Sequence, residues 1–197
     1  MTAFMDLALQ EARAAGERGE VPVGCVVVHG GTVLRLALVI AGSQPPRLVA
    51  VTKIGSGFAE QTSTSALVVG PTGVGLGANG TLYVADTLNS RIAAIPDATA
   101  RLSSAGTGIT VSQGNNLAGP LGLAIAPGGD ILTVNGTNGD IVETTPGGQQ
   151  VATAVLDNTP TQGLPNGNGA LFGLAVAPGG TGVYFVDDDT NTLNLLN

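Results

Sequence analysis

The hydrophobic positions of this chain follow one pattern near the start and another in the rest. Residues 2–16 repeat apolar side chains at spacings of three and four, which predicts one amphipathic helix. β-Branched residues then crowd residues 21–28, and a His-Gly-Gly turn at 29–31 leads into a second apolar run at 32–40. The beginning of the chain is therefore predicted to be a helix followed by a β-hairpin.

From about residue 70 onward, the pattern becomes an internal repeat. Three segments align, each with an apolar strand, a glycine-rich turn and a second apolar strand, and they cover residues 70–84, 119–133 and 171–186. Their aligned glycines are Gly73, Gly122 and Gly173, 49 and 51 residues apart. A third strand is predicted at 91–95 and 140–144, and a fourth at 150–156. Four short strands in such a period are typical of a propeller blade.

Composition supports a folded, mainly β chain. Hydrophobic residues make up 43% of the sequence and charged residues 11%, with 31 Gly and 11 Pro to form tight turns. The predicted fold is a partial β-propeller of about three blades, preceded by one α-helix and a strand. Because closed propellers use about four to eight blades, we expect the open ends of this fragment to drive self-association.

The distribution of charge restricts the partners more than the net charge of −7 does. Residues 102–197 contain seven acids and no Lys or Arg, so this half is expected to repel nucleic acid. The longest apolar stretch, 33–41, is too short to span a bilayer, and the acids Asp6 and Glu11 interrupt any signal peptide. We therefore expect no nucleic-acid or membrane partner, a cytoplasmic location for the chain as it stands, and an unidentified protein or small molecule as ligand.

Two family resemblances divide the chain. Residues 1–31, which contain FMDLAL and GEVPVG, resemble the first helix and strand of bacterial tRNA adenosine deaminases. Residues 32–197, which contain GPTG and YVADTLNSRI, are similar to bacterial NHL-repeat propeller proteins. The resemblances imply a deaminase-like start at 1–31, a propeller fragment at 32–197 and a fusion seam near residues 29–33.

The chemistry of a zinc deaminase requires a His or Cys and two further Cys on the metal, with a Glu for proton transfer, in H-x-E and P-C-x-x-C motifs. This chain has one His, His29, and one Cys, Cys25, and neither motif. We expect no catalytic residues, with Cys25 a small strand residue and His29 a turn residue. A single Cys also excludes an internal disulfide.

Two further motifs point to ligands and have simpler interpretations. Residues 75–80 match G-x-G-x-x-G, but an apolar strand follows in place of the helix that a dinucleotide needs, so no cofactor is expected. Four turn residues offer oxygen atoms to a hard cation, as in the calcium-holding propellers related to lactonases: Asp86, Asn135, Asp187 and Asp188. The alternative is that these side chains bond to their own turns.

The sequence therefore favours a non-catalytic propeller fragment with a binding or scaffold role. Two alternatives stay open at this point. One is a lactonase-like, metal-dependent propeller enzyme, and the other is an inactive deaminase-derived protein that keeps only a docking surface.

Overall fold

The computed structural model describes residues 27–29, 32–39, 47–63 and 67–197. The helix predicted over 2–16 and the residue Cys25 lie outside these ranges. The first sheet contains three antiparallel strands in the order β1-β2-β3, with bounds β1 Val27–His29, β2 Thr32–Val39 and β3 Arg47–Ser56. His29 pairs with Thr32, so the hairpin predicted at the seam is present, with His29 as the last residue of its first strand. A two-stranded pair follows, β4 Gln61–Ser63 with β5 Leu67–Val69.

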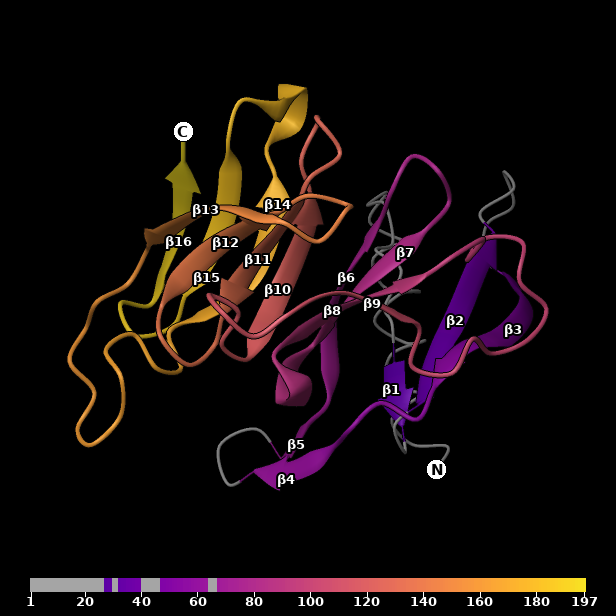
Figure 1. Ribbon diagram of the computed structural model, residues 1–197, viewed down its shortest axis with the longest axis horizontal. Coiled ribbons are helices and arrows are strands. Elements are labelled where there is room, and N and C mark those ends of the chain that lie inside the picture. The colour runs from indigo at the N-terminus through magenta and orange to yellow at the C-terminus, as the bar shows by residue number, and fades with distance from the viewer. Residues whose placement is uncertain (1–26, 30–31, 40–46, 64–66) are drawn as a thin grey trace.

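Three antiparallel sheets then stand side by side and form the repeat (Figure 1). Blade 1 comprises β6 Pro71–Leu76, β7 Leu82–Asp86, β8 Arg91–Ile95 and β9 Ile109–Gln113, with the 3₁₀ turn η1 Thr87–Asn89. Blade 2 comprises β10 Pro120–Ile125, β11 Ile131–Asn135, β12 Asp140–Thr144 and β13 Gln150–Val155. Blade 3 comprises β14 Leu171–Val176, β15 Val183–Asp187 and β16 Thr192–Leu196, with the 3₁₀ turn η2 Pro178–Gly180.

The mainly β, partial-propeller fold predicted from the sequence is confirmed. The third strands β8 and β12 have the predicted bounds, and β13 ends one residue before the predicted end. Glycines with positive φ close the hairpins between the first two strands of each blade, among them Gly80, Gly129 and Gly179 at φ +77°, +96° and +84°. Blade 3 departs from the pattern, because its sheet has three strands within the described residues.

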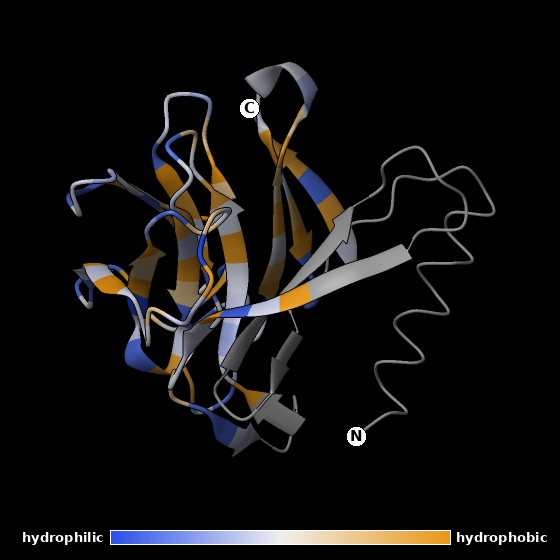
Figure 2. Ribbon diagram, turned by 90° about the vertical axis from the view of Figure 1, so that its right-hand side faces the viewer, coloured by the Kyte–Doolittle hydropathy of each residue, from blue (hydrophilic) through white to orange (hydrophobic). Residues whose placement is uncertain are grey.

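The hydrophobic core lies between the sheets. Blades 1 and 2 share a buried cluster that includes Tyr83, Ile92, Leu123, Ile131 and Val142. A second cluster joins blade 2 to blade 3, and a third packs the end of β3 and the loop after it onto blade 1. Figure 2 shows the corresponding apolar bands on the strands, with polar residues mainly in the loops. Each blade is therefore stabilised by its neighbour, as a repeat fold requires.

The repeated glycines lie on the inner strands β6, β10 and β14, which run side by side. A Cβ at Gly73 would collide with the backbone of Leu121, and a Cβ at Gly122 would collide with the carbonyl oxygen of Phe172. The inner strands of adjacent blades therefore approach each other only because glycine has no side chain.

Within the described parts of the chain, no helix has the length and apolar character needed to cross a membrane.

Candidate functional site

Polar residues concentrate in the turn between the second and third strands of every blade. The turns begin at Asp86, Asn135 and Asp187, all three of which are buried. The fifth residue of each turn is left-handed, with φ +46° at Ser90, +68° at Gly139 and +54° at Asn191. A left-handed fifth residue therefore recurs in all three turns, and the side chains that the turns carry differ.

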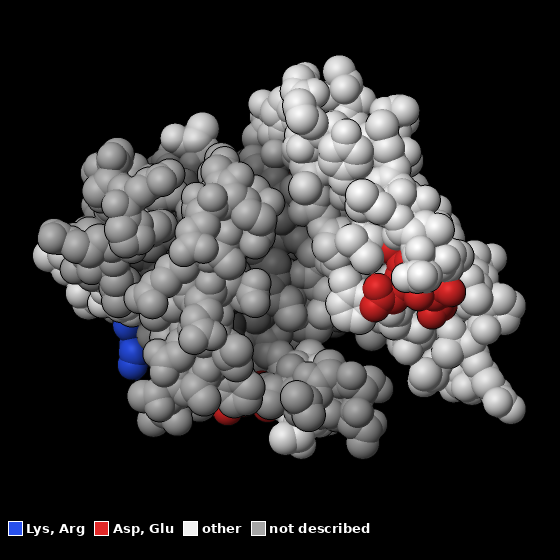
Figure 3. Space-filling view, turned by 180° about the vertical axis from the view of Figure 1, so that it is seen from behind, with Lys and Arg blue, Asp and Glu red and all other residues white. Residues whose placement is uncertain are grey.

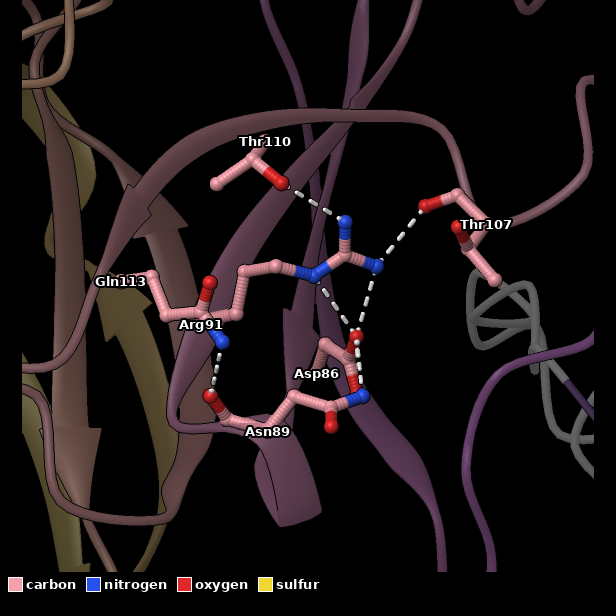
Figure 4. A network of polar contacts seen from close by, with 6 residues as sticks. All are labelled: Asp86, Asn89, Arg91, Thr107, Thr110 and Gln113. Carbon is pink, nitrogen blue, oxygen red and sulfur yellow. Dashed lines mark hydrogen bonds and ion pairs between the residues drawn. The ribbon is translucent and has the colours of Figure 1, made fainter.

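In blade 1 this turn holds a closed network of polar contacts (Figure 4). The Arg91 guanidinium donates from Nε to Asp86 at 2.8 Å, and the ion pair between Arg91 Nη2 and Asp86 measures 2.7 Å. Arg91 also donates to the Thr110 hydroxyl and to the Thr107 carbonyl, each at 3.0 Å. The Asn89 amide donates to both oxygens of Asp86 at 3.1 Å. Because buried charges must be paired and hydrogen-bonded, this network fixes the turn and joins it to the loop before β9.

Blades 2 and 3 replace the ion pair with other bonds. Asn135 accepts from the Ala118 backbone at 3.0 Å and donates to the Asn116 carbonyl at 2.7 Å. Asp140 occupies the position of Arg91, and burial raises the pKa of its carboxyl while a hydrogen bond from Asn138 opposes the rise. In blade 3 the Asp187 carboxylate accepts from the Thr190 backbone at 3.1 Å. The three turns are thus held by local bonds of different kinds.

The structure places the four residues predicted as cation ligands in the turns of the three blades. Asp86, Asn135 and Asp187 belong to three different blades and each makes the local bonds described above, while Asp188 is exposed. Within residues 27–29, 32–39, 47–63 and 67–197, no three His, Cys, Asp or Glu side chains are placed to share a metal ion. At Asp86 and Asp187 the carboxylate oxygens serve the turns, as the alternative interpretation from the sequence proposed.

A hollow of about 490 Å³ runs along the inner strands of the three blades. Its walls are built from the segments around Gly73, Gly122 and Gly173. The one polar side chain among its lining residues is Thr72, whose hydroxyl donates to the Leu121 carbonyl at 2.8 Å and lies 3.0 Å from the Thr87 hydroxyl. The hollow therefore has a defined shape, but Thr72 is the single polar side chain in its lining that could bind a ligand.

A second cleft, of about 430 Å³, opens between blades 2 and 3, and it contains a carboxylate. Glu143 on β12 lies among mainly apolar neighbours that include Leu132, Ile141 and Val183, and the polar residues Thr153, Thr181 and Asn197 also line the cleft. No described residue forms a hydrogen bond or an ion pair with the Glu143 side chain. A half-buried carboxylate without a partner, surrounded by apolar walls, is the chemistry of a binding site.

The substitutions between blades explain why this cleft exists. Across the sheet of blade 1, Tyr83 pairs with Ala94 and Ala94 with Ile109. The equivalent row in blade 2 pairs Leu132 with Glu143 and Glu143 with Ala152. Leu132 thus replaces the larger Tyr83, and Ala152 replaces the larger Ile109, which leaves space. In the middle of the row, Glu143 replaces the small Ala94.

Glu143 was not singled out from the sequence. The signal that identifies it is the aligned repeat, in which the same position of the third strand holds Ala94 in blade 1 and Leu195 in blade 3. Of the two residues considered for zinc, His29 lies on β1 and Cys25 lies outside the described ranges.

On the face shown in Figure 3, few charged side chains of the described residues are visible. On the rear face, acidic side chains gather in one patch, and a basic side chain appears at the opposite edge. This agrees with the sequence, where every Lys and Arg lies before residue 102.

Side-by-side antiparallel sheets joined through glycine-bearing inner strands define a partial β-propeller, and solved propellers of the NHL and related types are similar to it. No family model matches the chain. One similar structure comes from the nidogen–laminin complex, with a TM-score of 0.56 and 14% identity over 86% of this chain and 59% of that one. Another is a gluconolactonase from Xanthomonas campestris, with a TM-score of 0.51 and 16% identity over 85% of this chain and 45% of that one. The chain thus spans about half the length of these propellers, and the likeness establishes the fold.

A curated relative matches a short part of the sequence. A tRNA-specific adenosine deaminase from Agrobacterium fabrum is 64% identical over 33 residues, which are 17% of this chain and 22% of the relative. This short match supports the deaminase resemblance noted in the sequence.

Proposed function

We propose that the chain is a non-catalytic propeller fragment with a binding role, and that its ligand occupies the cleft between blades 2 and 3. The observation that carries this proposal is the unpartnered carboxylate of Glu143 in an apolar cleft of about 430 Å³. Cavities of about 300–1,000 Å³ are the usual size for small-molecule sites. The chemistry favours a small, mainly apolar molecule that carries one positive charge.

The polar residues elsewhere support a binding role over a catalytic one. Asp86 and Arg91 neutralise each other inside blade 1, and Asp187 holds its own turn. A general acid or base must reach the substrate with its proton. Groups that are buried and already bonded in structural turns are poorly placed for that work.

Binding of a cationic probe tests this proposal. We expect hexyltrimethylammonium to bind more tightly than hexanol, and hexanoate to bind least, in titrations followed by NMR chemical shifts. Glu143→Gln removes the charge at nearly constant volume, and we expect it to weaken binding of the cation roughly fivefold, since a partly exposed ion pair contributes about 1 kcal/mol. Asp189→Asn makes the same charge change in an exposed turn outside the cleft and serves as the matched control.

Equal weakening by both substitutions would show that only the net charge matters, and the proposal would fail. It would also fail if hexanoate bound as tightly as the cation. Glu143→Gln should leave hexanol binding unchanged, because the apolar walls remain.

A lactonase-like, metal-dependent enzyme is the second candidate, supported by the likeness to a gluconolactonase. The deaminase-derived alternative rests on the 33-residue match. The candidate calcium ligands Asp86, Asn135 and Asp187 lie in separate blades, and the zinc motifs are absent from the sequence. We therefore expect elemental analysis of the purified chain to find neither stoichiometric calcium nor stoichiometric zinc. Hydrolysis of gluconolactone that EDTA abolishes and calcium restores would establish the lactonase, and inosine formed in tRNA would establish the deaminase.

A further inference from the structure

The junction between blades 1 and 2 is filled at the place where the junction between blades 2 and 3 has its cleft. At the first junction the buried side chain of Tyr83 packs with Leu123 and Ile131 of blade 2. At the second junction the equivalent residue is Leu132, which lines the cleft. The filled junction is therefore a template for a molecule that would occupy the open one.

The cross-strand register makes the two positions equivalent. Tyr83 is the second residue of β7, and Leu132 is the second residue of β11. Each pairs with the fourth residue of the next strand, which is Ala94 in blade 1 and Glu143 in blade 2. Paired residues point to the same side of a sheet. The Glu143 carboxylate therefore stands beside the position at which blade 1 carries an aromatic ring.

The facing wall of the cleft also has smaller side chains than its counterpart. At the first junction this wall includes Ile125, the last residue of β10, and Ile131, the first residue of β11. The corresponding residues of β14 and β15 are Val176 and Val183, and both line the cleft. Each valine is one methylene smaller than the isoleucine that it replaces. The space that Tyr83 fills at the first junction is thus enlarged from both sides at the second.

Exposure along the row shows where the mouth of the cleft lies. In blade 1, Tyr83 is 5% exposed, Ala94 is 8% exposed and Ile109 is 63% exposed. In blade 2, Leu132 and Glu143 are half-buried and Ala152 is exposed. A molecule that enters past Ala152 would reach Glu143 first and Leu132 after it.

We propose that the cleft binds a protonated arylalkylamine, with its ring in the space equivalent to that of the Tyr83 side chain and its ammonium group against Glu143. The proposal rests on the binding role proposed above and specifies the shape of the ligand. Paired residues on adjacent strands have Cβ atoms about 4.5–5.5 Å apart. A linker of about one or two carbon atoms between ring and nitrogen spans this separation.

A rigid ring suits this space better than a flexible chain does. An aromatic ring buries a large apolar area without internal rotation, whereas an alkyl chain must lose the freedom of several bonds when it binds. The ammonium group would give Glu143 the partner that no described residue provides. A half-buried carboxylate gains from such a partner, because its desolvation is otherwise uncompensated.

NMR titrations with three ammonium ions of equal charge test the proposal. We expect 2-phenylethylammonium to bind roughly fivefold more tightly than hexylammonium, because fewer bonds are ordered. The same preference is expected over 2-cyclohexylethylammonium, which has the same length and a ring without planar faces. Nuclear Overhauser effects from the phenyl protons to the methyl groups of Leu132 and Val183 would locate the ring.

Two substitutions restore side chains of blade 1 in blade 2. Leu132→Tyr supplies the ring from the chain itself and should weaken binding of 2-phenylethylammonium by roughly tenfold or more, since it occupies the same space. Ala152→Ile narrows the mouth at an exposed strand position, where a β-branched residue is well tolerated, and should act in the same direction. Leu102→Tyr is the matched control, because Leu102 is 93% exposed and does not line the cleft. Circular dichroism monitors the folding of each variant.

The outcomes separate this proposal from the proposed function. If hexyltrimethylammonium binds through Glu143 but 2-phenylethylammonium binds no more tightly than hexylammonium, the binding role stands and the arylalkylamine is wrong. The arylalkylamine is also wrong if a folded Leu132→Tyr or Ala152→Ile variant binds it as the unmodified chain does, or if Leu102→Tyr weakens binding equally. If no ammonium ion binds, both proposals are refuted.

Discussion

At the scale of single residues, one turn position supports three different sets of bonds. Asp86 is neutralised by Arg91, Asn135 replaces the acid with an amide that needs no counterion, and Asp187 holds its turn through a backbone amide. The left-handed fifth residue is common to all three turns. The turn geometry is therefore the repeated feature, and the ion pair is one of several ways to satisfy it.

The glycine at the centre of each repeat segment is constrained more strongly. A Cβ at Gly122 would meet the Phe172 carbonyl oxygen, and Val134 and Leu174 would be within 3.0 Å of it. We expect Gly122→Ala to destabilise the fold by about 1–3 kcal/mol, the usual cost of overpacking. Gly128→Ala is the control, because a Cβ there meets nothing within 4 Å and both changes restrict the unfolded chain alike. Urea unfolding followed by circular dichroism measures the difference, and equal midpoints for the two variants would refute the close-approach argument.

At the scale of elements, strands bounded by clear turn residues were predictable from the sequence. The Asn-Gly and Gly-Gly turns located the first hairpin of each blade, and β8 and β12 followed from their apolar runs. The strand β3 was not predicted, because Arg47–Ser56 contains no counterpart of the repeated glycine turn. The cleft was not predicted either, since its volume depends on how Leu132 and Ala152 fill space relative to Tyr83 and Ile109. That comparison requires the cross-strand register, which a single sequence does not provide.

At the scale of the whole molecule, the core clusters lie between neighbouring sheets. The three core clusters join blade 1 to blade 2, blade 2 to blade 3, and the segment around Ile54 and Phe58 to blade 1. Among the described strands, β1 has three residues and pairs with β2 at the edge of its sheet. The blades therefore draw their stability from one another and from the segment around Ile54 and Phe58.

We accordingly expect a chain without residues 1–31 to keep its β-sheet circular dichroism signal and a cooperative thermal transition. The deletion removes β1 and frees the edge of β2, so the cost should appear as a greater tendency to aggregate, because unpaired edges invite further strands. Phe58→Ala in the full chain is the informative comparison. It empties a buried position shared by β3 and blade 1, and it should cost about 3–5 kcal/mol, far more than the deletion. If the shortened chain stays soluble but loses its β-sheet signal, residues 1–31 are integral to the fold and the division into two parts is wrong.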